Sequence, residues 1–275
     1  MGGHHIGLGP DELAGNAGLG RYVFLPGDPS RARALGERFR DRRTIATPRG
    51  LDGHLGTLDS ARGAIDVLAI ATGIGAPAAE VVVFELLQAG ARRLLRVGSC
   101  GTMRPEIQPG QVVIATGAVR DDGTGEHYAP IEYPALAHPA AVEALRRGAE
   151  RAGLADEVFL GLCHAKASLY AREFGYGPAG ERNLAYCDWL RRCGVAASEM
   201  ECGALFIVAS TWAPQLRTLA ASDRGDVQAG AVLAVFAADD SRMRGVDAAV
   251  AGRAQERAIQ VALEGVRAWA ERDRV

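Results

Sequence analysis

Long apolar runs are missing from this chain of 275 residues, and none approaches the roughly 18 residues that a membrane-spanning helix needs. The first residues also lack a basic region followed by an apolar core, so we expect no secretory signal. No excess of one charge is present, because the formal net charge is −2. That balance indicates neither a nucleic-acid-binding surface nor an acidic tail. We therefore expect neither a membrane nor a nucleic acid among the partners.

Cysteine is scarce, and its spacing follows no metal-binding or redox motif. The five cysteines show neither CxxC nor CxxxC spacing. An odd number in a chain of this size is typical of reduced thiols, so we expect a cytoplasmic protein without a metal site. Each cysteine is most simply interpreted as a small buried hydrophobic residue. They are Cys100, Cys163, Cys187, Cys193 and Cys202.

Glycine, by contrast, is abundant: the chain has 35, against a usual share of about 7%. Short apolar runs such as Tyr22–Leu25, Ile65–Ala71 and Arg93–Val97 are typical of strands, and they alternate with helical patterns. The alternation predicts one α/β domain over residues 1–275, with a mixed, mainly parallel central sheet flanked by helices.

Glycine-rich turns are expected directly after three of these strands, at Gly27, at Gly73–Gly75 and at Gly98–Gly101. Ligands of open α/β sheets bind outside the carboxyl ends of the strands, so the three turns could line one crevice. Further along, we expect an apolar helix over Ser198–Thr211 and a strand over Leu216–Ala221. A long helix is expected to close the chain, over about 247–272.

The segment from Arg96 to Gly101 combines a cation with small residues. Arg96 offers a planar fork of donors, and Ser99 offers a hydroxyl beside a backbone N–H. This combination suits an oxyanion such as phosphate. Taken alone, the segment fits equally well a plain strand-to-turn transition with a surface arginine.

Five segments in this order resemble the nucleoside phosphorylase family, which includes hexameric bacterial purine nucleoside phosphorylase and uridine phosphorylase. The resemblance extends from His5 to about Arg224. It implies the phosphorylase α/β/α fold, inorganic phosphate as co-substrate, no organic or metal cofactor, and a homo-oligomer built from dimers; the choice between dimer and hexamer stays open. The segments are His5-Ile6-Gly7-Leu8, Leu25-Pro26-Gly27-Asp28-Pro29-Ser30-Arg31, Thr72-Gly73-Ile74-Gly75-Ala76-Pro77, Arg96-Val97-Gly98-Ser99-Cys100-Gly101 and Glu199-Met200-Glu201.

The resemblance implies a phosphate site made of Gly27, Arg31, Arg96 and Ser99, with Arg49 lent across the dimer interface. Several cationic donors are what a phosphate nucleophile needs to be held in place. Arg49 is followed by Gly-Leu where the family usually has Glu-Phe, so its surroundings differ.

The resemblance also implies a ribose site. Glu201 would accept hydrogen bonds from the 2′- and 3′-hydroxyls, Met200 would pack on the sugar, and His5 would reach the 5′-hydroxyl from the neighbouring subunit. A carboxylate suits a vicinal diol because it offers two acceptor oxygens and no donor. Glu199 fits better as a helix-start glutamate.

The base site departs from both branches of the family. Uridine phosphorylases read uracil with a Gln and an Arg, which would fall here near Glu173 and Gly175. Tyr170 and Arg172 remain as candidate base-binding residues, the arginine only with a shifted loop.

Asp223, after Ala-Ser at an expected strand end, resembles the acid with which purine phosphorylases protonate N7, and Arg224 could assist it. An aspartate at such a position can also simply cap a turn. The sequence thus favours phosphorolysis of a purine nucleoside to base and ribose 1-phosphate. A uridine phosphorylase, a nucleosidase and a non-catalytic nucleoside-binding protein stay open.

Overall fold

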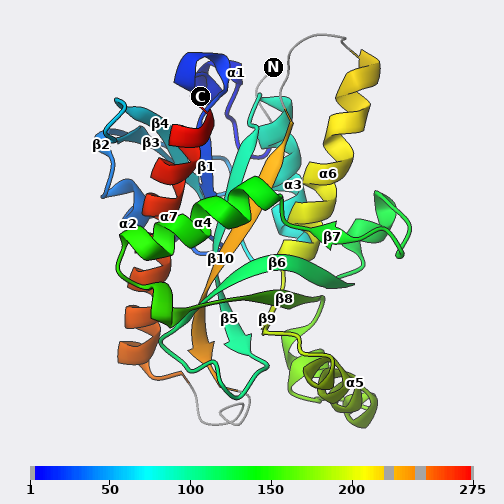
Figure 1. Cartoon of the computed structure of the whole chain (residues 1–275). Coiled ribbons are helices and arrows are strands. Elements are labelled where there is room, and N and C mark those ends of the chain that lie inside the picture. Colours follow the sequence, from blue (N-terminus) through cyan, green and yellow to red (C-terminus); the bar gives the residue numbers. More distant parts are fainter. Residues whose placement is uncertain (1–3, 220–225, 239–245, 274–275) are drawn as a thin grey trace.

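A mixed sheet of ten strands organises the computed structural model, which describes residues 4–219, 226–238 and 246–273 (Figure 1). The strands are β1 Tyr22–Leu25, β2 Arg40–Ile45, β3 Gly53–Leu58, β4 Ile65–Ile70, β5 Arg93–Thr102, β6 Val112–Asp121, β7 Ala135–Leu136, β8 Val158–Lys166, β9 Ala197–Glu199 and β10 Gln228–Ala237. The helices are α1 Pro10–Leu13, α2 Pro29–Gly36, α3 Ala76–Gln88, α4 Pro139–Arg151, α5 Gly180–Arg192, α6 Cys202–Leu219 and α7 Ala248–Asp273.

Half of the sheet closes on itself. β5 pairs with β10 in parallel and with β9 antiparallel, while β6 joins β10 to β8 and β8 joins β9. These pairings form a ring of five strands. From β5 the sheet continues as an open extension through β1, β4, β3 and β2. Parallel and antiparallel pairs both occur, so the predicted α/β class with a mixed sheet is confirmed.

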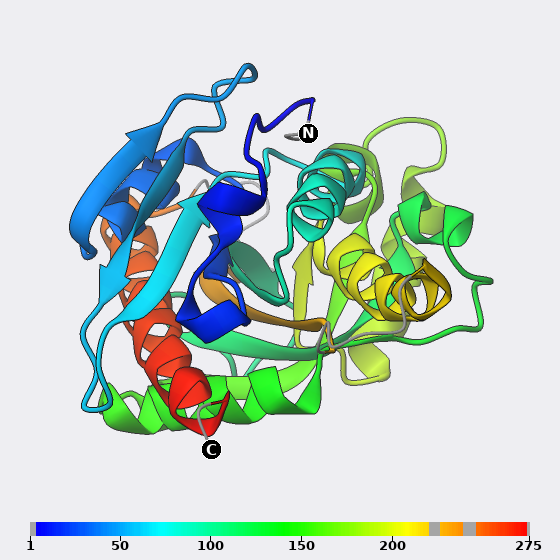
Figure 2. The same ribbon diagram turned by 90° about the horizontal axis from the view of Figure 1, so that it is seen from above.

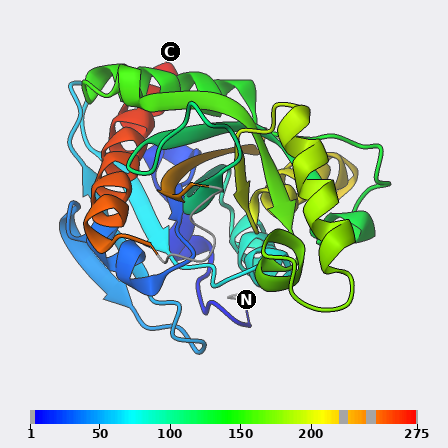
Figure 3. The same cartoon turned by 90° about the horizontal axis from the view of Figure 1, so that it is seen from below.

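Helices cover both faces of the sheet. α3 and α6 pack together over one apolar core, which includes Leu86, Phe206 and Leu233. α4 and α7 pack together over the other core, which includes Trp269, Leu145 and Val232. Figure 2 shows the two helix pairs on opposite sides of the curved strands, and Figure 3 shows α5 far from α2 and α7. Within the described ranges, no helix is both long and apolar enough to cross a membrane.

Three expectations from the sequence are corrected by the fold. The turn predicted at Gly98–Gly101 is wrong, because β5 continues to Thr102 and pairs with β10 through Gly101. The strand predicted over Leu216–Ala221 is wrong where the structure describes it, because α6 extends to Leu219. The helix expected from Ser198 begins only at Cys202, since residues 197–199 pair as β9 with β5 and β8.

Three strands were missed by the sequence analysis. β10 is a buried run of small and apolar residues with no alternation, which periodicity alone does not separate from a helix. β2 and β3 form a polar edge hairpin, and only four of its residues pair in register as Arg40, Arg43, Thr44 and Ile45 with β3. The charged, exposed side chains of β2 carry no strand signal.

Candidate active site

A cavity of about 990 Å³ opens where β1, β5 and β10 reach their carboxyl ends, at the lower end of the sheet in Figure 1. Gly27 follows β1, Ser99 lies near the end of β5, and Ala238 follows β10. This is the crevice that the glycine pattern predicted. Six of the predicted site residues line it: Gly27, Arg31, Arg96, Ser99, Met200 and Glu201.

Arg31 reaches the cavity because its motif starts a helix. The Asp28 carboxylate accepts a hydrogen bond from the Ser30 N–H at 2.7 Å, and Pro29 occupies the first turn of α2. Arg31 then lies in that first turn, 4% exposed, with Nη1 donating to the Val97 carbonyl at 3.1 Å. Gln255 accepts from its Nε at 3.2 Å. Among the described residues, no carboxylate lies within ion-pair distance of Arg31.

The charge of Arg31 is therefore poorly compensated. Burial, with the nearby Arg96 guanidinium, lowers the pKa of Arg31 to about 10. Two buried guanidinium groups close to one another disfavour each other's charge. An anion bound between them would relieve that repulsion.

Arg96 carries one donor without an acceptor. Its Nε donates to Glu199 Oε2 at 3.0 Å and its Nη2 pairs with Glu201, while Nη1 is buried without a hydrogen-bond partner in the described part of the chain. Burial alone would lower the pKa of Arg96, but Glu201 and Glu199 outweigh it and raise the pKa above its usual value. A buried donor without a partner is costly, so Nη1 indicates a missing acceptor.

Gly98 makes room for this guanidinium. A Cβ at Gly98 would lie 2.8 Å from Arg96 Nη2 and 2.8 Å from Leu233 Cδ2. Any side chain there would push the guanidinium aside. Glycine at this position therefore serves the close approach of Arg96 rather than a turn.

Glu201 lies beside Arg96 and is 5% exposed. It accepts a hydrogen bond from the Gly75 N–H at 2.5 Å. Burial and the neighbouring Glu199 raise the pKa of Glu201, against the opposing effect of Arg96. The turn that holds Gly75 is tied to the Gly27 turn, because the Gly73 N–H donates to the Gly27 carbonyl at 3.1 Å. Both predicted loops thus meet at one carboxylate.

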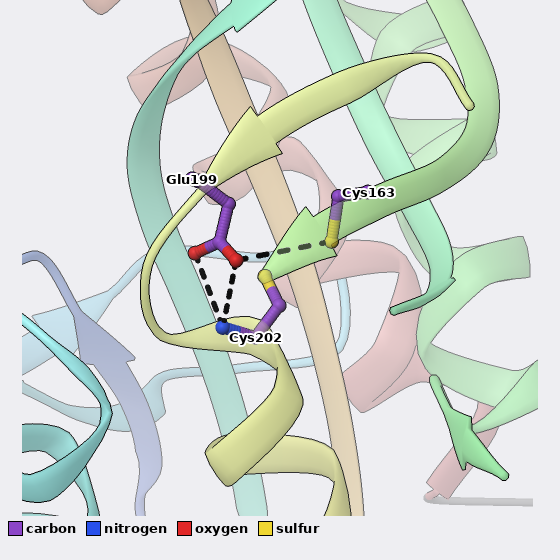
Figure 4. Close-up of side chains that lie close together, drawn as sticks. All are labelled: Cys163, Glu199 and Cys202. Atoms are coloured by element: carbon purple, nitrogen blue, oxygen red, sulfur yellow. Dashed lines mark hydrogen bonds between the residues drawn. The ribbon is translucent and has the colours of Figure 1, made fainter. Parts of the chain in front are cut away.

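Glu199 supports this arrangement from below. Its carboxylate accepts the Cys202 N–H at 3.0 and 3.1 Å and the Cys163 thiol at 3.9 Å (Figure 4). It also accepts the Glu201 N–H at 2.8 Å, which caps the start of α6 as expected of a helix-start glutamate.

Cys163, Glu199 and Cys202 lie close enough together to hold a metal ion (Figure 4). Burial and the neighbouring Cys163 raise the pKa of Cys202 well above its usual value, and metal binding requires a thiolate. The Glu199 oxygens are already taken by Arg96 and by backbone N–H groups. The cluster therefore fits a scaffold for Arg96 better than a metal site.

A second polar group at the cavity was missed by the sequence analysis: Lys166, Glu173 and Ser198. Lys166 Nζ lies 2.5 Å from Glu173 Oε2 and donates to Ser198 Oγ at 2.9 Å. The Ser198 hydroxyl donates to Glu173 Oε2 at 3.0 Å. The available signal was a lysine ending an apolar strand and a glutamate where a uracil-reading Gln would fall.

Other predicted residues lie away from the cavity within one chain. Tyr170 is 66% exposed and has Phe174 and Tyr176 as ring neighbours. Arg172 pairs with Asp121 at 2.7 Å and stacks over Tyr186, 4.6 Å from the ring centre. The base-binding role of both residues stays a prediction that this geometry does not favour.

His5 and Arg49 are also outside the cavity lining. His5 Nδ1 lies 2.7 Å from Glu85 Oε1 on α3, and Arg49 is exposed in the turn between β2 and β3. Their predicted roles depend on a neighbouring subunit. Asp223 and Arg224, predicted as catalytic, lie outside the described residues.

Comparison with known proteins identifies the family. The sequence profile of the phosphorylase superfamily matches residues 21–264. A uridine phosphorylase from Treponema pallidum is 33% identical over 266 residues, which cover 96% of this chain and 93% of the relative. The chain belongs to the phosphorylase superfamily. The nucleoside phosphorylase family predicted from the five motifs is thereby confirmed.

Other phosphorylase relatives differ in the base that their names give. A uridine phosphorylase from Thermococcus kodakarensis is 33% identical over 239 residues, covering 85% of this chain and 76% of the relative. A guanosine phosphorylase from Halorubrum lacusprofundi is 28% identical over 200 residues, covering 73% and 76%. The chain is thus an enzyme of the pentosyltransferase type, and phosphate is its co-substrate, as expected from the motifs.

Proposed function

We propose that this phosphorylase cleaves the N-glycosidic bond of a ribonucleoside with phosphate, giving free base and ribose 1-phosphate. The observation that carries the proposal is the pair of buried arginines, Arg31 and Arg96, beside Glu201 in one cavity. Arg31 lacks a carboxylate partner among the described residues, and Arg96 Nη1 lacks an acceptor there. Phosphate oxygens match both deficits.

In the proposed reaction, Glu201 binds the ribose diol and fixes the sugar over the phosphate. A phosphate oxygen attacks the anomeric carbon from the face opposite the base. The C–O bond forms as the C–N bond breaks, and the electron pair of the C–N bond stays on the base nitrogen, which then takes a proton. Positioning and the charge of Glu201 beside the cationic sugar supply the acceleration.

For the base, we propose uracil as the first candidate, because the names of most of the similar proteins refer to uridine. A purine is the second candidate, supported by the relative named guanosine phosphorylase and by the Ser222-Asp223 motif. The sequence analysis placed the purine first. A nucleosidase is disfavoured, since hydrolysis gives two buried arginines no anion to bind.

We further propose that the enzyme works as a homo-oligomer built from dimers, with hexamer and dimer both consistent with the motifs. His5 and Arg49 would then complete the ribose and phosphate sites of the neighbour. Mass measurement in solution by light scattering tests this. A monomer that is fully active would contradict it.

The experiment for the proposed function is an assay of base release from uridine, inosine, guanosine, adenosine and cytidine, each with and without phosphate. We expect release only with phosphate and formation of one ribose 1-phosphate per base. Equal release without phosphate would support a nucleosidase instead. Binding without any release would support a non-catalytic nucleoside-binding protein.

A further inference from the structure

The Lys166–Glu173 pair remains unexplained by the phosphate and ribose sites, although both residues line the same cavity. We propose that Glu173 reads the base by accepting a hydrogen bond from a ring N–H that lies next to a carbonyl group. The substrates would then be nucleosides of lactam bases, such as uracil, hypoxanthine and guanine. This inference rests on the proposed function and names its substrate class.

One oxygen of Glu173 is occupied and the other is available. Oε2 lies 2.5 Å from Lys166 Nζ and accepts from the Ser198 hydroxyl at 3.0 Å. Oε1 has no hydrogen-bond partner among the described residues. It lies 3.2 Å from where a Cβ at Gly101 would stand, so the glycine leaves the space beside it open.

The surroundings hold Glu173 in one place. Lys166 is 2% exposed and fixed at the end of β8, where its Nζ also approaches the Glu199 carbonyl at 3.4 Å. Ser198 is in turn contacted by His164 Nδ1, at 3.4 Å from Oγ. A carboxylate fixed by two donors on one oxygen presents the second oxygen in a defined direction.

The chemistry of this oxygen selects its ligand. The ion pair with Lys166 holds Glu173 as a carboxylate, which accepts hydrogen bonds and cannot donate them. Uracil, hypoxanthine and guanine carry a proton on the ring nitrogen beside a carbonyl. Cytosine and adenine carry a lone pair at the corresponding ring nitrogen, which the carboxylate repels. Sites built around a buried polar group reject substrates that leave the group unpaired.

The test uses methylated substrates with the unmodified full-length enzyme at saturating phosphate. It compares kcat/KM of uridine with that of 3-methyluridine and cytidine, and of inosine with that of 1-methylinosine and adenosine. We expect each lactam nucleoside that is cleaved to exceed its methylated and amino counterparts by about 10- to 100-fold, the worth of one hydrogen bond to a charged group. Equal rates for the methylated or amino nucleosides would overturn the inference.

Variants locate the effect at Glu173. Glu173→Ala should lower kcat/KM for the lactam nucleoside by roughly 10- to 100-fold and bring its ratio to the methylated nucleoside close to one. Glu173→Gln keeps an acceptor oxygen and should retain part of the ratio. The control Glu181→Gln, on the exposed start of α5, should change neither value. An unchanged ratio in Glu173→Ala would overturn the inference.

Failure of this inference is distinguishable from failure of the proposed function. Phosphate-dependent cleavage without discrimination contradicts the role of Glu173 alone. No phosphate-dependent cleavage of any of these nucleosides contradicts the proposed function, and the inference with it. The KM for phosphate should be the same in all Glu173 variants, because Arg31 and Arg96 are untouched.

Discussion

The two ends of the active-site cavity are built differently. At the phosphate and ribose end, Arg31, Arg96 and Glu201 come from a helix start, a central strand and the segment that leads into α6. At the base end, Glu173 belongs to a single π-helical turn, Leu169–Glu173, and depends on Lys166 for its position. The groups that perform the chemistry are thus fixed by the sheet, while the groups proposed to choose the base lie on a short segment that can vary.

The largest effect is expected from Arg96→Ala. This change leaves Glu199 and Glu201 buried without their shared cation. Removing one partner from a buried ion pair costs about 3–5 kcal/mol, so the free energy of unfolding should fall by that amount in a urea titration. The same change at the other end, Lys166→Met, should cost less, because Glu173 is 17% exposed and can be reached by water. Equal losses would erase the difference between the two ends.

Arg31→Met should separate phosphate binding from stability. Arg31 has no carboxylate partner among the described residues, so its loss leaves no buried charge unpaired. We expect the KM for phosphate to rise by about 10- to 100-fold with the nucleoside KM nearly unchanged. The control Arg38→Met removes an exposed arginine of the next turn, paired with Glu256, and should leave the phosphate KM as it was. A phosphate KM that Arg31→Met leaves unchanged would remove Arg31 from the site.

The raised pKa of Glu201 predicts the acid side of the pH profile. The ionised carboxylate accepts the ribose hydroxyls, so kcat/KM should fall with decreasing pH at values above 4.5, the ordinary pKa of glutamate. A carboxyl group whose pKa is higher in the folded than in the unfolded state gains stability when it is protonated. Activity should therefore fall while near-ultraviolet circular dichroism still reports a folded protein. Loss of both signals together would contradict this assignment.

The smallest effect on stability is expected from Arg49→Ala, since Arg49 is exposed in the turn between β2 and β3. The free energy of unfolding should change by no more than about 0.5 kcal/mol. If a neighbouring subunit borrows this arginine, the KM for phosphate should nevertheless rise. An unchanged phosphate KM would restrict the phosphate end to residues of one chain.

The sequence was most informative where motif and backbone geometry coincide. The Gly-Asp-Pro-Ser-Arg motif encodes its own helix cap, so the place of Arg31 followed from local chemistry. Glu201 was predicted from the resemblance, and its apolar surroundings in the chain already required a partner. Arg96 was found for the right reason in part, because Gly98 serves its guanidinium while the strand continues.

The base end could not be predicted, because its contacts join segments that are distant in the chain. Lys166 and Ser198 meet only through the pairing of β8 with β9, and β9 is three residues long. Arg172 looked like a base reader by its position, yet the fold turns it toward Asp121 on β6. Such contacts depend on strand order, which hydrophobic patterns alone do not specify.

The central claim is that the cavity binds phosphate as the nucleophile, and phosphate dependence of base release tests it most directly. Uridine, and in parallel guanosine, would be incubated with the enzyme in buffer depleted of phosphate, and base release followed as phosphate is added. The account predicts no release at zero phosphate, saturation with rising phosphate, and equal amounts of base and ribose 1-phosphate. Release at the same rate without phosphate, with free ribose as the second product, would contradict it.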